Sequence, residues 1–525
     1  MFAKNRNMSE ITASELEDRK VGKDLYSYQK GAIDKIFKCF EDAPEDYHLL
    51  YQLPTGGGKT VIFSEIVRQY IKHHSKKVLV LTHRIELCKQ TSTMLTEFGV
   101  VNKVIDSKAS LDDQNLYSCF VAMVETLNNR LNDDKLDISD IGLVIIDEAH
   151  YNSFTKLFKF FESSFILGVT ATPLSSNAKL PMKDNYNELI VGETIESLIE
   201  NRFLSRAETY LYNVGLTSLE VGANGDYTVK SSEDLYSNYN MLNKLLSAYE
   251  DCVKGKKTLI FNNGINTSLC VYDIFKSAGY PIAHLDNTCP KKERKRILRW
   301  FKETPNAILT SVSILTTGFD EPSVEAIILN RATKSLTLYY QMIGRGSRVL
   351  KNKSTFSVID LGNNFHRFGA WGADLDWHKI FRAPNYYLNN LLNDEELESN
   401  FRYEMPPELR AEFANSEEVY LDIKETYIDS IRKGESSKVV LERSIEQHAR
   451  ICTENSEDIY DAYALSKMLS DDIDHRIERY SKCISKSTHN FVSWLNEDYR
   501  KKLRAYIRDN FDTLYEEIHG KPPEN

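Results

Sequence analysis

The sequence predicts an α/β protein in which two tandem parallel-sheet domains precede a mostly helical C-terminal region. From about residue 23 to residue 380, short apolar runs alternate with amphipathic helical patterns, as in parallel sheets covered on both faces. A break near residues 200–206 divides these runs into two sets. After residue 380 glycine becomes scarce, and apolar residues recur with helical spacing, as from Tyr499 to Ile518.

Each expected strand is a short apolar run bounded by turn residues. The strands expected in the first sheet are 48–52, 78–82, 119–124, 143–147 and 165–169. Those expected in the second sheet are 208–213, 258–262, 282–285, 307–310, 325–329 and 356–360. We therefore predict an N-terminal extension (1–22), a first domain (23–205), a second domain (206–380) and a helical accessory region (381–525).

The composition limits the class of protein. A chain of 525 residues with 42% hydrophobic residues can form two to four domains with sizeable cores. We expect no membrane span, because no apolar run approaches about 18 residues, and no apolar stretch follows the basic N-terminus as in a secretory signal. The eight cysteines form no C-x-x-C pair, which argues against a zinc ribbon or a disulfide framework and fits a reducing cytoplasm.

Negative charge is concentrated in one segment. The net charge is −10, and residues 391–430, with twelve acidic and three basic residues, account for −9 of it. The chain before this segment is close to neutral, so a local basic groove for nucleic acid is compatible with the overall charge. The acidic segment is either an exposed helical face or a docking strip for a basic partner.

A glycine-rich loop follows the first expected strand and precedes a helical pattern. It runs through Thr55, Gly56, Gly57, Gly58, Lys59 and Thr60. Strand, glycine loop, Lys-Thr and helix together predict a phosphate site, because loop N–H groups and the positive helix end face the phosphate oxygens. Lys59 is expected to reach the β- and γ-phosphates, and the Thr60 hydroxyl to bind Mg²⁺. The alternative is a glycine turn without a ligand.

Acidic and hydroxyl residues follow two further strands of the first domain. Asp147 ends a buried strand and is expected to bind Mg²⁺, while Glu148 is expected to orient and deprotonate the attacking water. Thr170 and Thr172 are expected to hydrogen-bond His150 and to sense the nucleotide. The alternatives are an acid that caps a helix and a Thr-Pro pair that ends a strand.

Two arginines stand out in the second domain. Arg345 and Arg348 are three residues apart and flank Gly346, in a segment that begins at Gln341. The planar guanidinium suits the charge of a γ-phosphate, and an arginine that completes a phosphoryl-transfer site is worth about 10³–10⁵ in rate. The alternative is an exposed arginine pair.

Taken in order, these segments resemble the motifs of the superfamily 2 helicases, over roughly residues 23–370. The segments that look like motifs I, II, III, V and VI are 53–60, 147–150, 170–172, 316–320 and 341–348. Residues 25–29, 80–87 and 259–262 look like the Q element, motif Ia and motif IV. Within this superfamily of DEAH-type helicases, residues 315–348 and 360–364 most resemble RadD-like bacterial repair helicases and related phage helicases.

The resemblance implies two RecA-like domains that hold ATP and Mg²⁺ between them. It implies that Gln29 reads adenine, that Gly318 contributes to the ATP site, and that Asp320 reaches the ribose. The catalytic residues that it implies are Lys59, Glu148, Gln341, Arg345 and Arg348. The residues that it implies in contact with the nucleic-acid backbone are Thr82, Arg84, Thr126, Asn262 and Thr316.

The expected function is that of an ATP-dependent DNA helicase or translocase in repair, recombination or replication, in the cytoplasm of a bacterial or phage-infected cell. The alternatives are an RNA helicase and the motor subunit of a defence or restriction complex, with residues 381–525 as the protein-binding module. Two departures from the RadD-like pattern stand out: Tyr26 occupies a position that often holds arginine, and the chain has no cysteine-rich zinc module after the motor. The polarity of movement, strand separation and oligomeric state stay open.

Overall fold

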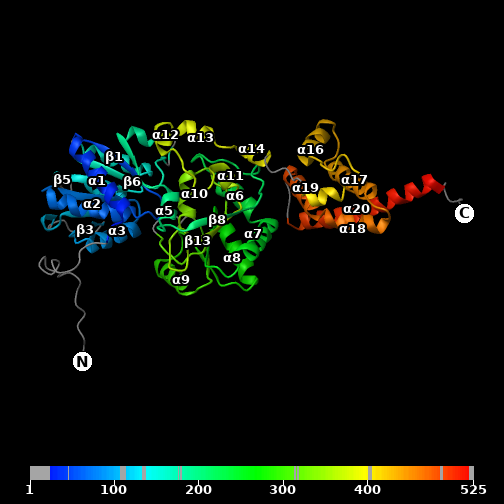
Figure 1. Cartoon of the computed structure of the whole chain (residues 1–525), viewed down its shortest axis with the longest axis horizontal. Coiled ribbons are helices and arrows are strands. Elements are labelled where there is room, and N and C mark those ends of the chain that lie inside the picture. The colour runs from blue at the N-terminus through cyan, green and yellow to red at the C-terminus, as the bar shows by residue number, and fades with distance from the viewer. Residues whose placement is uncertain are drawn as a thin grey trace, which may run out of the picture. The chain divides into compact units, whose positions relative to one another are not determined.

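The computed structural model divides the chain into two compact units (Figure 1). It describes residues 24–519 except 45, 107–113, 133–137, 176, 178–179, 313–314, 316–318, 400–404 and 485–488. Within these residues, the first unit runs to Tyr236 and from Lys244 to Asn393. The second unit comprises Ser237–Asn243 and the chain from Asp394 onward.

The first unit contains two parallel sheets, and the first of them has seven strands in the order β3-β4-β2-β5-β6-β1-β7. The strands are β1 (His48–Gln52), β2 (Lys77–Thr82), β3 (Asn102–Ile105), β4 (Cys119–Met123), β5 (Ile141–Asp147), β6 (Phe165–Thr170) and β7 (Glu188–Val191). The helices are α1 (Ser27–Asp42), α2 (Lys59–His73), α3 (Ile85–Glu97), α4 (Val124–Asn132) and α5 (Ile195–Glu200), and the 3-10 segments are Gln114–Leu116, Asn152–Phe160 and Met182–Asp184. Because β5, β6 and β1 are neighbours, their carboxyl ends meet at one edge of the sheet.

The second sheet has six parallel strands in the order β10-β11-β9-β12-β13-β8. The strands are β8 (Arg206–Leu211), β9 (Thr258–Asn262), β10 (Ile282–Leu285), β11 (Ile308–Val312), β12 (Ala326–Asn330) and β13 (Thr355–Asp360). The accompanying helices are α6 (Val229–Tyr236), α7 (Tyr239–Cys252), α8 (Ile265–Ser277), α9 (Lys291–Glu303), α10 (Leu336–Ile343), α11 (Asn364–Phe368), α12 (Trp377–Arg382) and α13 (Pro384–Asn389). One apolar cluster includes buried residues of both sheets, among them Ile146 and Ile327.

The predicted fold class is confirmed: two parallel-sheet domains precede a helical region. Every strand expected from the sequence is present, with ends that differ by at most two residues. The sequence missed β3 and β7, which are edge strands of four residues. Both carry side chains that are only partly buried, so they lack the continuous apolar run by which the central strands were recognised.

The predicted domain limits at 205 and 380 stay predictions. Residue 205 lies between β7 of the first sheet and β8 of the second. The first unit runs past 380 to Asn393, because α13 and the residues after it pack on its core through Tyr387, Leu388 and Leu391.

The second unit has a core of its own, formed by helices. They are α14 (Asp394–Ser399), α15 (Pro407–Ala411), α16 (Ile423–Arg432), α17 (Lys438–Glu454), α18 (Ile459–Met468), α19 (Ser470–Cys483) and α20 (His489–His519). The core includes Leu441, Ile473 and Leu503. Across all the residues that the structure describes, no helix is both long and apolar enough to cross a membrane.

A buried polar network joins α17, α19 and α20. Arg476, only 1% exposed, pairs with Asp472 at 2.9 Å. Asp472 also lies 2.9 Å from His448 Nε2, and the hydroxyl of Tyr499 lies 2.8 Å from His448 Nδ1. Burial lowers the pKa of His448 to about 4, so this histidine is neutral at pH 7. Burial would raise the pKa of Asp472, but His448 and Arg476 outweigh it and hold this pKa below its usual range.

Replacing Asp472 with alanine should destabilise the helical unit by about 3–5 kcal/mol, because Arg476 would keep a buried charge without its partner. Hydrogen–deuterium exchange of peptides from α17 and α19 in the full chain measures this loss. The matched control is Asp474→Ala on the same helix, which removes an exposed pair with Arg500 and should cost at most about 1 kcal/mol. Equal exchange in the two variants would contradict the prediction.

Candidate active site

The phosphate loop lies between β1 and α2 at the carboxyl edge of the first sheet. Gly56 and Gly58 have φ angles of 93° and 87°, in the left-handed region that glycine adopts without strain. A Cβ at Gly58 would lie 2.6 Å from Gln29 Nε2, so a larger residue does not fit there. Lys59, the first residue of α2, donates from Nζ to the carbonyl oxygen of Leu53 at 3.2 Å. Burial lowers the pKa of Lys59, and the carboxylates of Glu148 and Asp147 oppose that shift.

Two carboxyl groups follow β5 beside this loop. The backbone N–H of Glu148 donates to Asp147 Oδ1 at 3.0 Å. Burial and the neighbouring Glu148 raise the pKa of Asp147 to about 7. Burial also acts to raise the pKa of Glu148, but the charges of Lys59 and Arg345 outweigh it, so this pKa lies below its usual range. Glu148 has a φ of 53°, a strained conformation for a residue other than glycine and one that is common at functional sites.

One oxygen of Glu148 has no hydrogen-bond donor. Glu148 Oε2 is buried, and no donor among the described residues reaches it. The Nδ1 atom of His150 lies 3.5 Å from this oxygen. Burial lowers the pKa of His150 to about 4, so the histidine is neutral and does not form an ion pair at pH 7. An ionised, unpaired oxygen of this kind is suited to accept a proton from a bound water.

Hydroxyl and amide groups connect the carboxylates to the second domain. The Thr170 hydroxyl donates to the carbonyl of Thr172 at 2.9 Å, so it accepts from His150 Nδ1, 3.1 Å away. This fixes the tautomer of His150 and leaves its Nε2 free to accept from Gln341 Nε2 at 3.4 Å. Thr172 Oγ1 donates to Thr337 Oγ1 of α10 at 2.7 Å. The three residues that the sequence predicts for coupling are therefore brought together beside α10.

The arginines after α10 reach the phosphate loop and its surroundings. Arg348 donates from Nη1 to the carbonyl oxygen of Gly56 and from Nε to Asp320 Oδ1, both at 2.9 Å. Arg345 donates to the carbonyl of Phe319. Burial lowers the pKa of Arg345 to about 10, an effect that Glu148 opposes, and the guanidinium stays charged at pH 7.

The second domain approaches the phosphate loop closely. A Cβ on Gly344 would lie 2.8 Å from Thr55 Cβ, and one on Gly56 would lie 3.1 Å from Ser347 Oγ. Asp320, which the resemblance assigns to the ribose, pairs with Arg348 in this structure. Thr60 follows Lys59 in the first turn of α2.

Gln29, the predicted adenine contact, lies beside the same phosphate loop. The backbone N–H of Tyr26 donates to Gln29 Oε1 at 3.0 Å, and the Tyr28 hydroxyl donates to the carbonyl of Gly57 at 2.7 Å. The rings of Tyr26 and Tyr28 lie 4.3 Å and 5.2 Å from the ring of Phe203. Sequence reasoning did not assign Tyr28 and Phe203 to the site, although the position of Tyr28 directly before Gln29 was a signal for the first.

The predicted nucleic-acid contacts are only partly at the surface. Thr82 and Asn262 are buried, and their polar groups bond within the protein: Asn262 Nδ2 donates to Thr310 Oγ1 at 2.9 Å, and Thr82 Oγ1 to the carbonyl of Arg84 at 3.2 Å. Contact of these two residues with nucleic acid stays a prediction. Arg84 and Thr126 are half-buried, and Arg84 lines a cavity of about 650 Å³. Thr316 and Gly318 lie outside the described residues.

A lysine that the sequence analysis did not single out, Lys353, bonds to the loop that carries Arg345 and Arg348. Lys353 Nζ donates to the carbonyls of Gly346 at 2.6 Å, Arg348 at 2.8 Å and Pro322 at 3.1 Å. Burial lowers the pKa of Lys353 to about 8. A single lysine near a turn carries no sequence signal for this role.

Comparison with known proteins gives matches to both sheet domains. The family model described as "Type III restriction enzyme, res subunit" matches residues 22–175, and the one described as "Helicase conserved C-terminal domain" matches residues 237–349. A 51.5 kDa protein of a Lactococcus phage is 29% identical over 338 residues, which cover 64% of this chain and 70% of the phage protein. A Saccharomyces cerevisiae protein described as a candidate ATP-dependent helicase, IRC3, is 28% identical over 64% of this chain and 51% of its own length.

A solved structure extends the similarity of fold beyond the two sheets. The ATP-dependent Type ISP restriction-modification enzyme LlaBIII, in a complex with DNA, matches with a TM-score of 0.52 and 15% identity. The match covers 96% of this chain and 43% of that enzyme. Together with the two family models and the relatives that match across both sheets, the ordered motifs lead to one conclusion: this chain belongs to the superfamily 2 helicases and is an ATP-hydrolysing enzyme.

Proposed function

We propose that this protein is a motor that couples ATP hydrolysis to movement along nucleic acid, with DNA as its substrate. The observation that carries the proposal is the bond from Arg348 to the carbonyl of Gly56, which joins the second domain to the phosphate loop of the first. Since this contact depends on how the two domains approach each other, a change of nucleotide at the loop can change their separation. Alternating contacts of two domains with one strand would then move the protein along it.

The residues at the loop fit ATP as substrate. We assign Lys59 and the loop N–H groups of Gly56–Gly58 to the phosphates, and Gln29 to adenine. Glu148 accepts the proton of the attacking water through the oxygen that lacks a donor. Arg345 and Arg348 stabilise the charge on the transferred phosphoryl group.

The same edge of the sheet fits Mg²⁺. The Asp147 carboxylate and the Thr60 hydroxyl offer the oxygen ligands that this ion prefers. Burial and the neighbouring Glu148 raise the pKa of Asp147 to about 7, and a bound cation would stabilise its ionised form. When bound, the ion neutralises phosphate charge.

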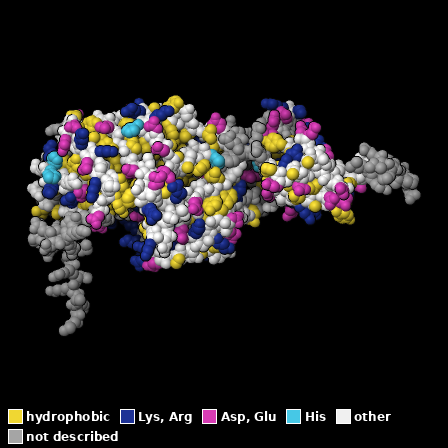
Figure 2. Space-filling view, in the orientation of Figure 1, with side chains coloured by type: hydrophobic (Ala, Val, Ile, Leu, Met, Phe, Trp, Pro, Cys, Tyr) yellow, Lys and Arg dark blue, Asp and Glu magenta, His cyan; other side chains and the backbone are white. Residues whose placement is uncertain are grey.

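A basic helix on the second domain supports nucleic acid as the partner. The cations of α9 are Lys291, Lys292, Arg294, Lys295, Arg296, Arg299 and Lys302. Arg294 and Arg296 pair with Glu86 and Glu293. The other five are exposed, and no ion pair within the described residues reaches them. Figure 2 shows dark-blue side chains gathered over α9, a surface suited to phosphate contacts.

DNA is favoured over RNA by the nature of the relatives. The matched LlaBIII structure contains DNA, and the family model of the first domain describes a restriction-enzyme subunit. The same relatives favour a second candidate, a motor subunit within a larger complex in which residues 381–525 bind a protein. The kinship with RadD-like repair helicases is supported by residues 315–348 and 360–364 alone. Native mass measurement of the protein purified from its own cells separates the two: a chain of its own mass contradicts the complex.

The test of the motor is the ATPase rate with single-stranded DNA, duplex DNA and RNA at two salt concentrations. We expect DNA to give the largest stimulation. Raising salt from about 50 to about 200 mM should weaken half-saturation about tenfold or more, as about three phosphate contacts would give. Glu148→Gln is the control, since it should bind DNA with ATP present but not turn over. Absence of stimulation by every nucleic acid would contradict the proposal.

A further inference from the structure

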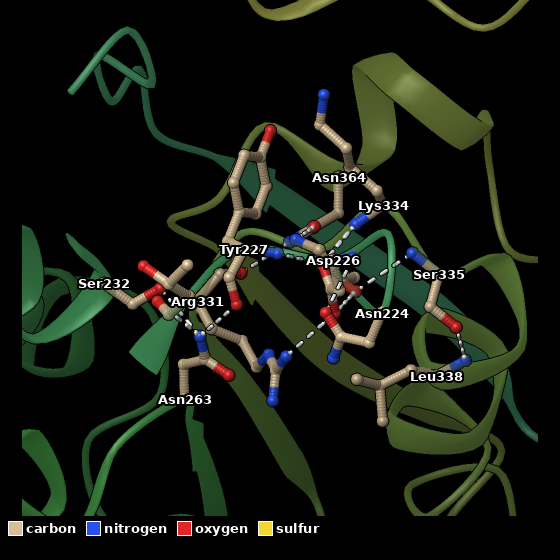
Figure 3. A network of polar contacts seen from close by, with 12 residues as sticks. Asn224, Asp226, Tyr227, Ser232, Asn263, Arg331, Lys334, Ser335, Leu338 and Asn364 are labelled. Carbon is tan, nitrogen blue, oxygen red and sulfur yellow. Dashed lines mark hydrogen bonds and ion pairs between the residues drawn. The ribbon is translucent and has the colours of Figure 1, made fainter. Parts of the chain in front are cut away.

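A short hairpin between β8 and α6 lies against the loop that begins α10 (Figure 3). Its ends are joined by bonds from Gly222 N to the carbonyl of Asp226 and from Thr228 N to the carbonyl of Glu220, both at 2.8 Å. Gly225, with a φ of 80°, makes the turn at its tip. The hairpin is thus a defined element, and Asn224 and Gly225 at its tip are exposed.

Asp226 fastens this hairpin to residues 331–334. Its Oδ1 accepts from the backbone N–H of Lys334 at 2.8 Å. Its Oδ2 accepts from Thr333 Oγ1 at 2.7 Å and from Arg331 Nη2 at 3.3 Å. Arg331 is only 4% exposed, so its charge depends on this carboxylate. Figure 3 shows Arg331 and Lys334 pointing toward Asp226.

The loop that Asp226 holds leads directly into the helix that serves the active site. Ser335 Oγ accepts from the backbone N–H of Leu338 and caps α10. From this helix, Thr337 contacts Thr172, and Gln341 contacts His150. A displacement of the loop therefore moves both contacts to the first domain, together with the arginines that follow the helix.

The tip of the hairpin lines the cavity of about 650 Å³ that is also lined by Arg84, His150 and Gln341. Arg84 and Lys334 bring positive charge to its wall, and Tyr151 and several leucines bring apolar surface. Asp226 is the one carboxylate on this wall within the described residues, and it is already bonded to the loop. Cations beside apolar surface suit the phosphate and the base of a nucleotide unit.

We propose that one nucleotide unit of a bound single strand occupies this cavity, and that Asp226 is the positioning residue that transmits its presence to α10. The proposal rests on the motor function above and deepens it. A strand in the cavity contacts the hairpin tip and Lys334, and the bonds of Asp226 carry the resulting shift into the first turn of α10. The nucleotide-sensing contacts of Thr337 and Gln341 then respond to the strand.

Two variants separate the two parts of the proposal. Asp226→Asn keeps the size of the side chain but removes its charge, and should lower the ratio of stimulated to basal ATPase rate by about 5–150-fold, the range of a typical coupling between sites. The concentration of a single-stranded oligonucleotide at half-saturation should change much less. Asn224→Trp removes the 3.3 Å bond from the Asp226 N–H to Asn224 Oδ1 but keeps the bonds of the Asp226 carboxylate to residues 331–334. It also fills the cavity, so it should raise the half-saturating concentration about tenfold, a loss that corresponds to about 1.4 kcal/mol.

The experiment uses the full chain, with DNA and RNA oligonucleotides as separate arms. The matched control is Asp273→Asn, an exposed carboxylate on α8 of the same domain, which should behave as the unaltered protein. Asp226→Glu, which keeps the charge that the buried Arg331 pairs with, should recover part of the stimulation that Asp226→Asn loses. A basal ATPase rate in Asp226→Asn equal to that of the unaltered protein tells loss of coupling from misfolding. An unaltered stimulation ratio in Asp226→Asn, or unaltered affinity in Asn224→Trp, overturns this inference and leaves the motor function standing. A wild-type protein that no oligonucleotide stimulates overturns both.

Discussion

Replacing Lys59 with alanine should reduce ATP hydrolysis to the background of the assay, a loss of at least about 10²–10³-fold, as for other groups that stabilise transition-state charge. Lys59 opens α2 at the end of the phosphate loop, and its ammonium lies in the field of Glu148 and Asp147. Removing it leaves two buried carboxylates facing the phosphates without the cation that balances them. The rate of phosphate release with and without DNA measures the effect.

The control for this variant is Lys72→Ala, an exposed lysine at the other end of the same helix, which should hydrolyse ATP normally. Binding of a fluorescent ATP analogue tells whether the loss lies in binding or in chemistry. Wild-type turnover by purified Lys59→Ala would mean that the phosphate site has been placed wrongly, and with it the roles of Glu148 and Asp147.

Much of the candidate site could be predicted because it lies at the ends of central strands. Asp147 and Thr170 end β5 and β6. In the sheet β6 lies between β5 and β1, and the phosphate loop follows β1. A buried parallel strand has a clear apolar signal, and polar residues at its carboxyl end point to the active edge. The order of the motifs along the chain was therefore enough to predict that these residues lie close together.

What could not be predicted depends on contacts between distant segments. The bond from Thr333 to Asp226 joins residues 107 positions apart, and Lys353 holds carbonyls of a loop through its buried ammonium. The sequence around Asp226, Thr333 and Lys353 contains no motif that would predict these contacts. Thr82 and Asn262 match motifs that were assigned to nucleic acid, yet their side chains fill hydrogen-bonding positions between strands and helices. Motif membership alone does not tell on which side of a strand a residue points.

Replacing Arg348 or Arg345 with alanine should slow ATP hydrolysis by about 10³–10⁵-fold while ATP still binds, as expected of arginines that act on the transition state. Arg348 bonds the carbonyl of Gly56, so its loss also releases the second domain from the phosphate loop. The charge of Arg345 acts on the carboxylate of Glu148. We therefore expect Arg345→Ala to slow the chemical step, and Arg348→Ala to weaken in addition the closure of the two domains.

These two effects can be told apart. Single-turnover hydrolysis measures the chemical step, and energy transfer between labels on the two sheet domains measures closure when a non-hydrolysable ATP analogue binds. Arg348→Lys should not restore the rate, because an ammonium cannot contact the Gly56 carbonyl, Asp320 and a phosphate with the planar geometry of a guanidinium. Arg382→Ala, an exposed arginine of the same domain, is the matched control. If Arg348→Ala and Arg345→Ala both kept wild-type single-turnover rates, catalysis would depend on the first domain alone, and the bond across the domains would have only a structural role.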